Sequence, residues 1–88
     1  MKIEIRSSFV RDAKNLPLNI QKKLAQAIQD IEKVDSLNAL RNIKQMKGSS
    51  KPAYRLRIED YRLCFYYLEN TAELIRILPR KTVYRYFP

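Results

Sequence analysis

The amino-acid sequence predicts an α+β domain in which an N-terminal helical hairpin packs on a three- to four-stranded antiparallel sheet. In the first part of the chain, apolar residues recur at helical spacing. In the second part, apolar and polar residues alternate with the two-residue period of strands. The length of 88 residues supplies one hydrophobic core, so we expect a single domain over residues 1–88.

The helical pattern covers residues 7–34. It follows residues 2–6, which alternate isoleucine with charged residues and therefore suggest a short strand at the edge of the sheet or beside another strand. Ser7 and Ser8 suit the N-cap of a first helix, and Pro17 both ends that helix and suits the start of a second. The apolar positions of the second helix fall on one face: Ile20, Leu24, Ala27, Ile28, Ile31 and Val34.

The strand pattern covers residues 53–58, 61–68 and 72–78. Short polar turns at residues 59–60 and 69–70 connect these segments into an antiparallel meander. We expect the helices to cover one face of the sheet and the opposite face to be open to solvent or a partner. The side chains predicted for the covered face are Tyr54, Leu56, Ile58, Leu63, Phe65 and Tyr67.

The remaining segments are less regular. Residues 38–42 fit a short helix or a turn, residues 43–46 can start a strand, and residues 47–52 form a basic loop. Pro79 should stop the last strand. Residues 80–88 form a basic aromatic tail with room for one helical turn.

The composition restricts the function. Eighteen Lys and Arg against nine Asp and Glu give a formal charge of +9, which favours nucleic acid or an acidic protein as the partner. The chain has no histidine and a single cysteine, Cys64, so we expect no internal disulfide, no metal and no cofactor. Without a signal-peptide pattern or a long apolar run, we expect a cytoplasmic protein with no membrane partner.

Arginines gather on the face that is predicted to be open. Arg55 and Arg57 project from the same side of one strand, and Arg62 comes from its neighbour, so Arg57 and Arg62 could reach one phosphate. Arg80 and Tyr84 follow the third strand and could close over the same end. Further cations in the loop and the tail extend this predicted phosphate-binding surface: Lys47, Lys51, Lys81 and Arg85.

This set of residues suits cleavage of RNA by its own 2′-hydroxyl. The hydroxyl must lose a proton, the charged phosphorane must be stabilised, and the 5′-oxygen must gain a proton. Arginines can stabilise the phosphorane, and a tyrosine such as Tyr84 can position or deprotonate the hydroxyl. Lys51, Lys47 or an arginine can assist the leaving group. Alternating arginines also form ordinary solvated strand faces, so the pattern by itself leaves both interpretations open.

Three motifs resemble a known family. Residues 46–48 (MKG) with residues 54–63 (YRLRIEDYRL) resemble the "LKG…YRLRVGDYRVIY" core of the RelE/ParE superfamily of toxins. Residues 78–85 (LPRKTVYR) are similar to the "GHRKDVYR" ending, and residues 9–20 are similar to its "F…A…LP…IQ" hairpin. The resemblance covers nearly the whole chain and implies the fold described above.

The resemblance also implies roles for individual residues. Arg55 and Arg57 match the basic positions of the first motif strand, and Arg62 matches a phosphate-binding arginine. Arg80 matches the arginine after the last strand, and Tyr84 the tyrosine that orients the attacking hydroxyl. The departure lies in "GH", which Leu78-Pro79 replaces here, so a histidine common in relatives is absent.

RelE-like members cleave messenger RNA in the A site of the small ribosomal subunit, so the resemblance implies an endoribonuclease that inhibits translation and is the toxin of a type II toxin–antitoxin system. It also implies a cognate antitoxin with an acidic toxin-binding segment. Two alternatives stay open: a ParE-like inhibitor of DNA gyrase without nuclease activity, and a non-toxic basic binding protein. Having both Arg80 and Tyr84 favours RNA cleavage, because ParE-like members generally lack this pair.

Overall fold

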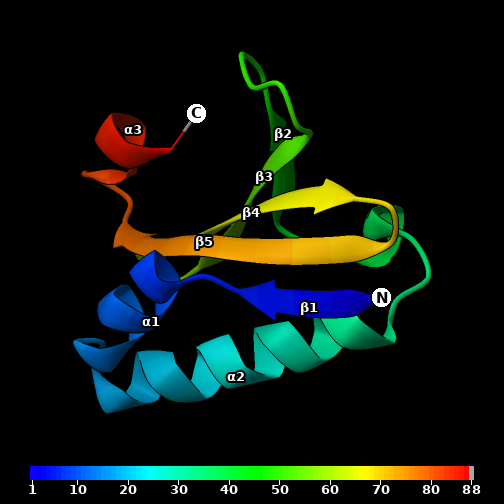
Figure 1. Ribbon diagram of the computed structural model, residues 1–88. Helices are drawn as coiled ribbons and strands as arrows, with labels where there is room; N and C mark the ends of the chain where they lie inside the picture. Colours follow the sequence, from blue (N-terminus) through cyan, green and yellow to red (C-terminus); the bar gives the residue numbers. More distant parts are fainter. Residues whose placement is uncertain (88) are drawn as a thin grey trace.

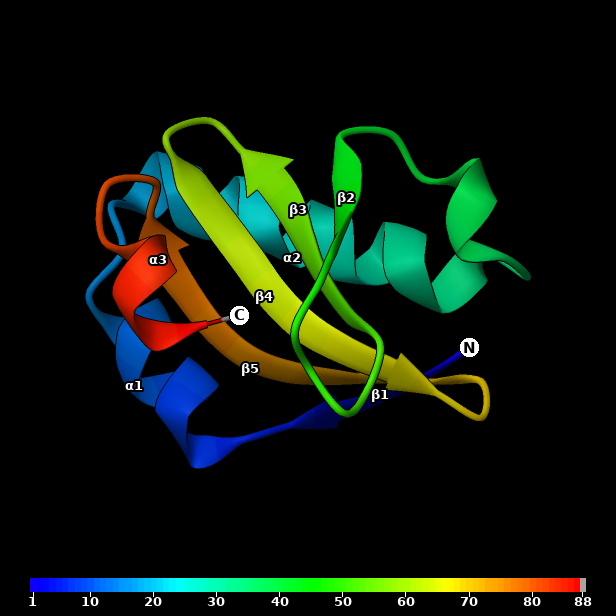
Figure 2. The ribbon, with the colours of Figure 1, turned by 90° about the horizontal axis from the view of Figure 1, so that it is seen from above.

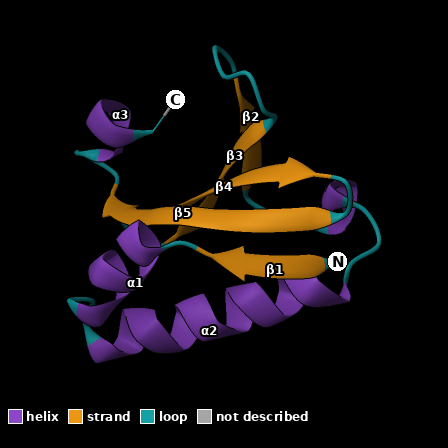
Figure 3. Cartoon of the chain, viewed as in Figure 1, coloured by secondary structure: helices purple, strands orange, loops and turns teal. Residues whose placement is uncertain are grey.

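One mixed five-stranded sheet forms the centre of the protein, with the strand order β1-β5-β4-β3-β2. The computed structural model describes residues 1–87, so Pro88, the end of the predicted tail, lies outside the described residues. Figure 1 shows the elements in chain order, and Figure 3 separates helices from strands. The strands are β1 (Lys2–Ile5), β2 (Ile43–Met46), β3 (Ala53–Ile58), β4 (Tyr61–Leu68) and β5 (Thr71–Pro79). The helices are α1 (Ser7–Lys14), α2 (Leu18–Lys33), a 3-10 turn η1 (Leu37–Ala39) and α3 (Val83–Tyr86).

The prediction of a three- to four-stranded antiparallel sheet is wrong in two respects. The sheet has five strands, and β1 runs parallel to β5, with Lys2 opposite Thr71 and Ile5 opposite Leu74. β5 is long enough to pair with β4 along one side and with β1 along half of the other. A parallel pair needs a long connection, and here the chain between the two strands includes both helices of the hairpin and the strands β2, β3 and β4.

The predicted meander of β3, β4 and β5 is confirmed, with antiparallel pairing at both junctions. Glu59 in the first turn has a φ of 54°, and Glu69 and Asn70 in the second have φ values of 50° and 58°. Two-residue hairpins favour such left-handed residues because their twist matches that of the strands. The segment β2 pairs antiparallel with β3 and lies at the edge of the sheet; a strand was predicted to start at these residues, but its place in the sheet was not.

The helix α2 covers one face of the sheet, as the sequence predicts (Figure 2). Its apolar stripe packs on the alternate apolar residues of the strands and forms the main core. Leu63, Phe65 and Leu74 are fully enclosed there. The other buried members are Phe9, Leu16, Ile20, Leu24, Ile31, Leu56, Ile58, Ala72 and Ile77.

The helix α1 lies beside β5, beyond the end of β1 (Figure 1). The prediction of a serine N-cap is wrong: Arg6 is the N-cap, and Ser7 is already helical. Ser8 Oγ instead donates a hydrogen bond to the Ile75 carbonyl at 2.6 Å. Pro17 precedes α2 as its N-cap rather than occupying its first turn. Thus α1 satisfies backbone groups on the edge of β5 that β1 does not reach.

The opposite face of the sheet is only partly open, which corrects the prediction for that face. The turn α3 lies over it, on the side away from α2 (Figure 2). A second, smaller core forms underneath, made of Ala53, Cys64, Leu78, Val83 and Phe87. None of the helices within residues 1–87 has the length and apolar character needed to cross a membrane.

Candidate active site

Two arginines face each other at the end of the β3–β4 hairpin. Arg57 and Arg62 are direct partners in the strand register, and Arg57 is exposed while Arg62 is half-buried. Nη1 of Arg62 donates hydrogen bonds to the carbonyl oxygens of Glu59 at 3.0 Å and Tyr61 at 2.8 Å. These bonds hold one corner of the Arg62 guanidinium against the turn, so its position is defined by the backbone.

Arg80 reaches the same end of the sheet through a backbone contact. Its amide N–H donates to the carbonyl oxygen of Asp60 at 2.8 Å, which ties the chain after β5 to the β3–β4 turn. The Arg80 residue is exposed. Its charge is close enough to lower the pKa of Arg62. Arg57, Arg62 and Arg80 therefore lie at the same end of the sheet, beside the β3–β4 turn.

Tyr84 extends from α3 toward this cluster. Its residue is 74% exposed, and its ring lies 4.8 Å from the guanidinium carbon of Arg55. Nη2 of Arg55 also donates to the Phe87 carbonyl at 3.4 Å. Arg55 thus contacts α3 at two points, and a cation–π contact holds the Tyr84 ring while leaving its hydroxyl side accessible.

The electrostatics of the cluster centre on Arg62. Burial, followed by the charges of Arg57 and Arg80, lowers the pKa of the Arg62 guanidinium, and Tyr84 acts in the opposite direction. Arginine remains charged at neutral pH despite such a shift. Three crowded cations therefore repel one another, and a bound anion such as a phosphodiester would relieve that repulsion.

The other predicted cations do not all join this cluster. Lys51 forms an ion pair with Glu73 at 3.5 Å and lies 5.6 Å from the ring centre of Tyr66. Tyr66 pairs with Ala53, four residues along β3 from Arg57, or about 13 Å away by strand rise. The structure therefore places Lys51 at the other end of the sheet. Three remaining cations are exposed: Lys47 in the β2–β3 loop, Lys81 beside Arg80, and Arg85 on α3.

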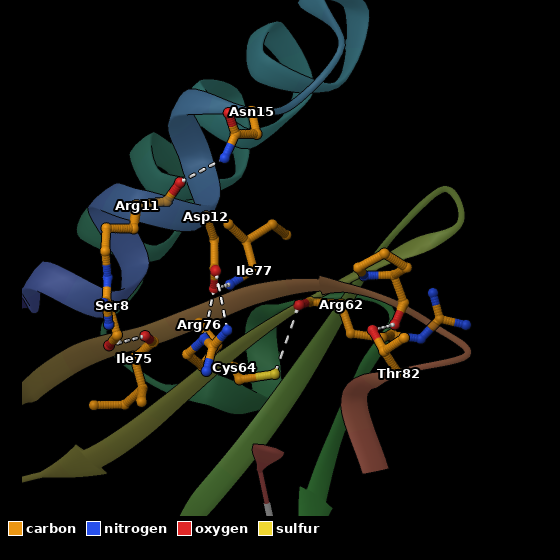
Figure 4. A network of polar contacts seen from close by, with 11 residues as sticks. Ser8, Arg11, Asp12, Asn15, Arg62, Cys64, Ile75, Arg76, Ile77 and Thr82 are labelled. Carbon is orange, nitrogen blue, oxygen red and sulfur yellow. Dashed lines mark hydrogen bonds and ion pairs between the residues drawn. The ribbon is translucent and has the colours of Figure 1, made fainter. Parts of the chain in front are cut away.

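Two side chains that support this face, Arg76 and Asp12, were not predicted from the sequence. Arg76 in β5 donates from Nε and Nη2 to both carboxylate oxygens of Asp12 in α1, at 2.7 and 3.1 Å (Figure 4). Its guanidinium carbon also lies 5.1 Å from the ring centre of Tyr86 in α3. A signal was present, because an arginine in a mostly apolar strand needs a partner.

Cys64 lies between Arg55 and Arg76 in the sheet register and is completely buried. Burial raises the pKa of its thiol to about 12. The thiol is therefore protonated at neutral pH, and its burial agrees with the role of a small filler in the core under α3.

Comparison with known proteins places the chain in a family. No protein-family model matches it. However, it is 36% identical to Toxin RelE3 of Methanocaldococcus jannaschii over 89 residues, covering 100% of both chains. The chain belongs to the RelE family of toxins. The resemblance inferred from the sequence motifs is thereby confirmed at the level of the family.

Solved structures of RelE toxins agree with this assignment. A RelB–RelE antitoxin–toxin complex from Methanococcus jannaschii matches with a TM-score of 0.81 and 33% identity, over 97% of this chain and 99% of that chain. An archaeal RelE–RelB complex from Pyrococcus horikoshii matches with a TM-score of 0.72 and 17% identity, over 90% and 93% of the chains. At that identity the second match shows a common fold only.

Proposed function

We propose that this RelE-family toxin is an endoribonuclease that cleaves messenger RNA in the A site of the small ribosomal subunit. The observation that carries the proposal is the arrangement at the β3–β4 turn: Arg57 lies opposite Arg62, the Arg80 amide is bonded to Asp60 of the same turn, and the exposed Tyr84 ring stacks on Arg55, the neighbouring position on the same face of β3. Three cations with one exposed phenol match what in-line attack on a phosphodiester requires.

In the proposed reaction the 2′-oxygen of a nucleotide attacks the adjacent phosphorus while the bond to the 5′-oxygen breaks. The 2′-hydroxyl loses its proton and the departing 5′-oxygen gains one, leaving a 2′,3′-cyclic phosphate and a 5′-hydroxyl. Arg57, Arg62 and Arg80 stabilise the charge that develops on the phosphorane oxygens. Tyr84, held by its contact with Arg55, orients the 2′-hydroxyl.

The acid–base steps have no histidine to rely on, because the chain contains none. Catalysis would therefore depend mainly on positioning and on charge stabilisation, each of which the ribosome can improve by fixing the RNA. We expect slow cleavage of free RNA and faster cleavage of message on the ribosome.

The proposed partner is a cognate antitoxin with an acidic toxin-binding segment. The toxin relatives from Methanococcus jannaschii and Pyrococcus horikoshii are each in complex with an antitoxin. In this chain, the +9 charge and the exposed Arg57 and Arg80 favour an acidic segment that covers the arginine cluster. Binding of such a segment should weaken steeply with increasing salt.

Primer extension on a defined message, with purified ribosomes and purified toxin, tests the proposal. We expect new 3′ ends at A-site codons, and Arg62→Ala and Arg80→Ala should each lower the cleavage rate about 100-fold. Tyr84→Phe, which keeps the ring on Arg55, should lower it about 10- to 100-fold. Arg11→Ala removes an exposed arginine from α1 and serves as the matched control.

Two results would contradict the proposal. One is a message that stays intact on ribosomes at toxin excess, while the same preparation blocks supercoiling by DNA gyrase. The other is cleavage that survives in the Arg62→Ala and Arg80→Ala double variant at the rate of Arg11→Ala. Either result would remove the arginine cluster from any role in RNA cleavage.

A further inference from the structure

The turn α3 is too short to hold its own conformation. It has four residues, from Val83 to Tyr86, whereas isolated helices need several turns to be stable. Its position must therefore come from contacts with the sheet. Val83 and Phe87 supply the apolar part of these contacts by filling the small core around Cys64.

Two arginine–tyrosine contacts connect α3 to the sheet through its exposed tyrosines. Arg55 from β3 lies 4.8 Å from the Tyr84 ring, and Arg76 from β5 lies 5.1 Å from the Tyr86 ring. The two arginines stand in the same row of the sheet, one on each side of Cys64. The turn is therefore fixed at two points from two strands, which restrains its rotation over the sheet.

The two contacts differ in what supports the arginine. Arg76 is oriented by Asp12, whose carboxylate takes both hydrogen bonds from the guanidinium and a third from the Ile77 amide at 3.0 Å (Figure 4). The side chains of Arg76 and Asp12 are only 24% and 13% exposed, so water screens their attraction weakly. A bidentate pair of this kind fixes the plane of the guanidinium, and with it the surface offered to Tyr86.

We infer that Asp12 and Arg76 are positioning residues that act through Tyr86 to hold α3 with Tyr84 facing the arginine cluster. This inference rests on the proposed function, because it assigns them a part in orienting the attacking hydroxyl. In this role they act through α3 rather than by contact with RNA. The ion pair of α1 and β5 sets the angle of α3, and α3 sets the place of the phenol.

The experiment combines hydrogen exchange with cleavage kinetics on purified full-length toxin. Tyr86→Ala removes the ring from a 56% exposed residue and leaves the Asp12–Arg76 pair intact, so it should fold normally. Arg76→Ala removes the orienting arginine. Tyr86→Phe keeps the ring and serves as the conservative rescue, and Arg11→Ala is the charge control on α1.

We expect faster exchange of the Arg85 and Phe87 amides, whose hydrogen bonds close α3, in Tyr86→Ala and Arg76→Ala. With a single defined message as substrate, kcat should fall about 10-fold in both variants while KM stays within about twofold of the wild type. The reason is that a misplaced phenol lowers transition-state stabilisation more than it lowers the affinity for the substrate. Tyr86→Phe should restore both readouts to within about twofold of the wild type.

Unchanged exchange in Tyr86→Ala, or a wild-type kcat in that variant, overturns the inference. So does a matching loss in Tyr86→Phe, since that variant keeps the ring. If the wild-type toxin cleaves no message at all, the cleavage measurement contradicts the proposed function and leaves the hydrogen-exchange measurement unaffected. The exchange arm still decides whether Arg76 anchors α3: faster exchange supports the anchoring, and unchanged exchange rejects it.

Discussion

The two faces of the sheet share one backbone, and side chains alternate between them, yet one face buries many more apolar residues than the other. The face under α2 carries a continuous apolar core, with Leu63 and Phe65 completely enclosed. The face under α3 carries arginines, with a small core of five buried residues only beneath the turn. The larger apolar core lies on the α2 face, and the other face is left free to hold charge.

This difference shows how a small protein can tolerate a crowded group of cations. Arg57 and Arg62 lie opposite each other on neighbouring strands, an arrangement that repels. The main core on the far side of the sheet offsets that repulsion. The following variants test whether the stability of the fold depends mainly on the α2 face and only weakly on the arginine cluster.

The largest effect is expected on the α2 face. Phe65→Ala should lower the free energy of unfolding by about 3–5 kcal/mol, because the ring is fully buried and its removal leaves a cavity. Urea denaturation followed by circular dichroism measures this loss. Leu68→Ala in the same strand, at a residue that is 51% exposed, should change it by less than about 0.5 kcal/mol. Equal losses in the two variants would refute the division between the faces.

An intermediate effect is expected under α3. Phe87→Ala should cost about 1–2 kcal/mol, less than Phe65→Ala, because the terminal turn can detach while the rest stays folded. Cys64 reports on this detachment, since it is buried in the same small core and its thiol pKa is about 12. An aromatic disulfide reagent should modify Cys64 at least about tenfold faster in Phe87→Ala. Arg85→Ala, on the exposed side of the turn, should react like the wild type.

A smaller effect of opposite sign is expected for the arginine pair. Arg57→Gln should raise the free energy of unfolding by about 0.2–0.5 kcal/mol, because it removes repulsion from Arg62 at a solvent-exposed site. The gain should shrink as salt increases. Urea titrations at low and high salt measure it, with Lys22→Gln on α2 as the control. A loss above about 1 kcal/mol would mean that Arg57 supports the fold.

The smallest effect concerns the ion pair of Lys23 with Glu59, at 2.9 Å. The hydrogen bond from Lys23 lowers the pKa of the Glu59 carboxyl below its ordinary value of 4.5. Stability from this pair is therefore present above pH 4.5 and is lost as the pH falls through the lowered pKa. The difference between Glu59→Gln and the wild type should be full above pH 4.5 and should shrink as the pH falls through the lowered pKa of Glu59. Urea midpoints from pH 7 to pH 3 check this, with Glu69→Gln as the control.

Most of the meander could be predicted from the sequence because its signals are local. Alternation in residues 53–58 and 61–68 assigned each side chain to the correct face, including Arg57 and Arg62 opposite each other. The turns at Glu59 and Glu69 also came from local composition. Where neighbours in sequence are neighbours in space, period and turn chemistry are sufficient.

The rest could not be predicted because it depends on distant partners. Nothing within β1 indicates that it pairs in parallel with the far strand β5. An arginine at position 76 of a mostly apolar strand needs a partner, but nothing local indicates that the partner is Asp12, far away in the sequence. Lys51 was grouped with the arginines, but Glu73 holds it at the other end of the sheet. The chemical roles of the arginine cluster stay predictions until cleavage is measured.

The parallel pairing of β1 with β5 restricts when the sheet can fold during synthesis of the chain. The strand β1 leaves the ribosome before β5, its neighbour in the sheet, which is synthesised after α1, α2, β2, β3 and β4. Such non-local pairing delays folding until the partner segment is available. The complete sheet, and with it the cluster that Arg80 and Tyr84 join, can form only after β5 and α3 have been synthesised. A nascent chain that stops before β5 therefore lacks both the partner of β1 and two members of the cluster.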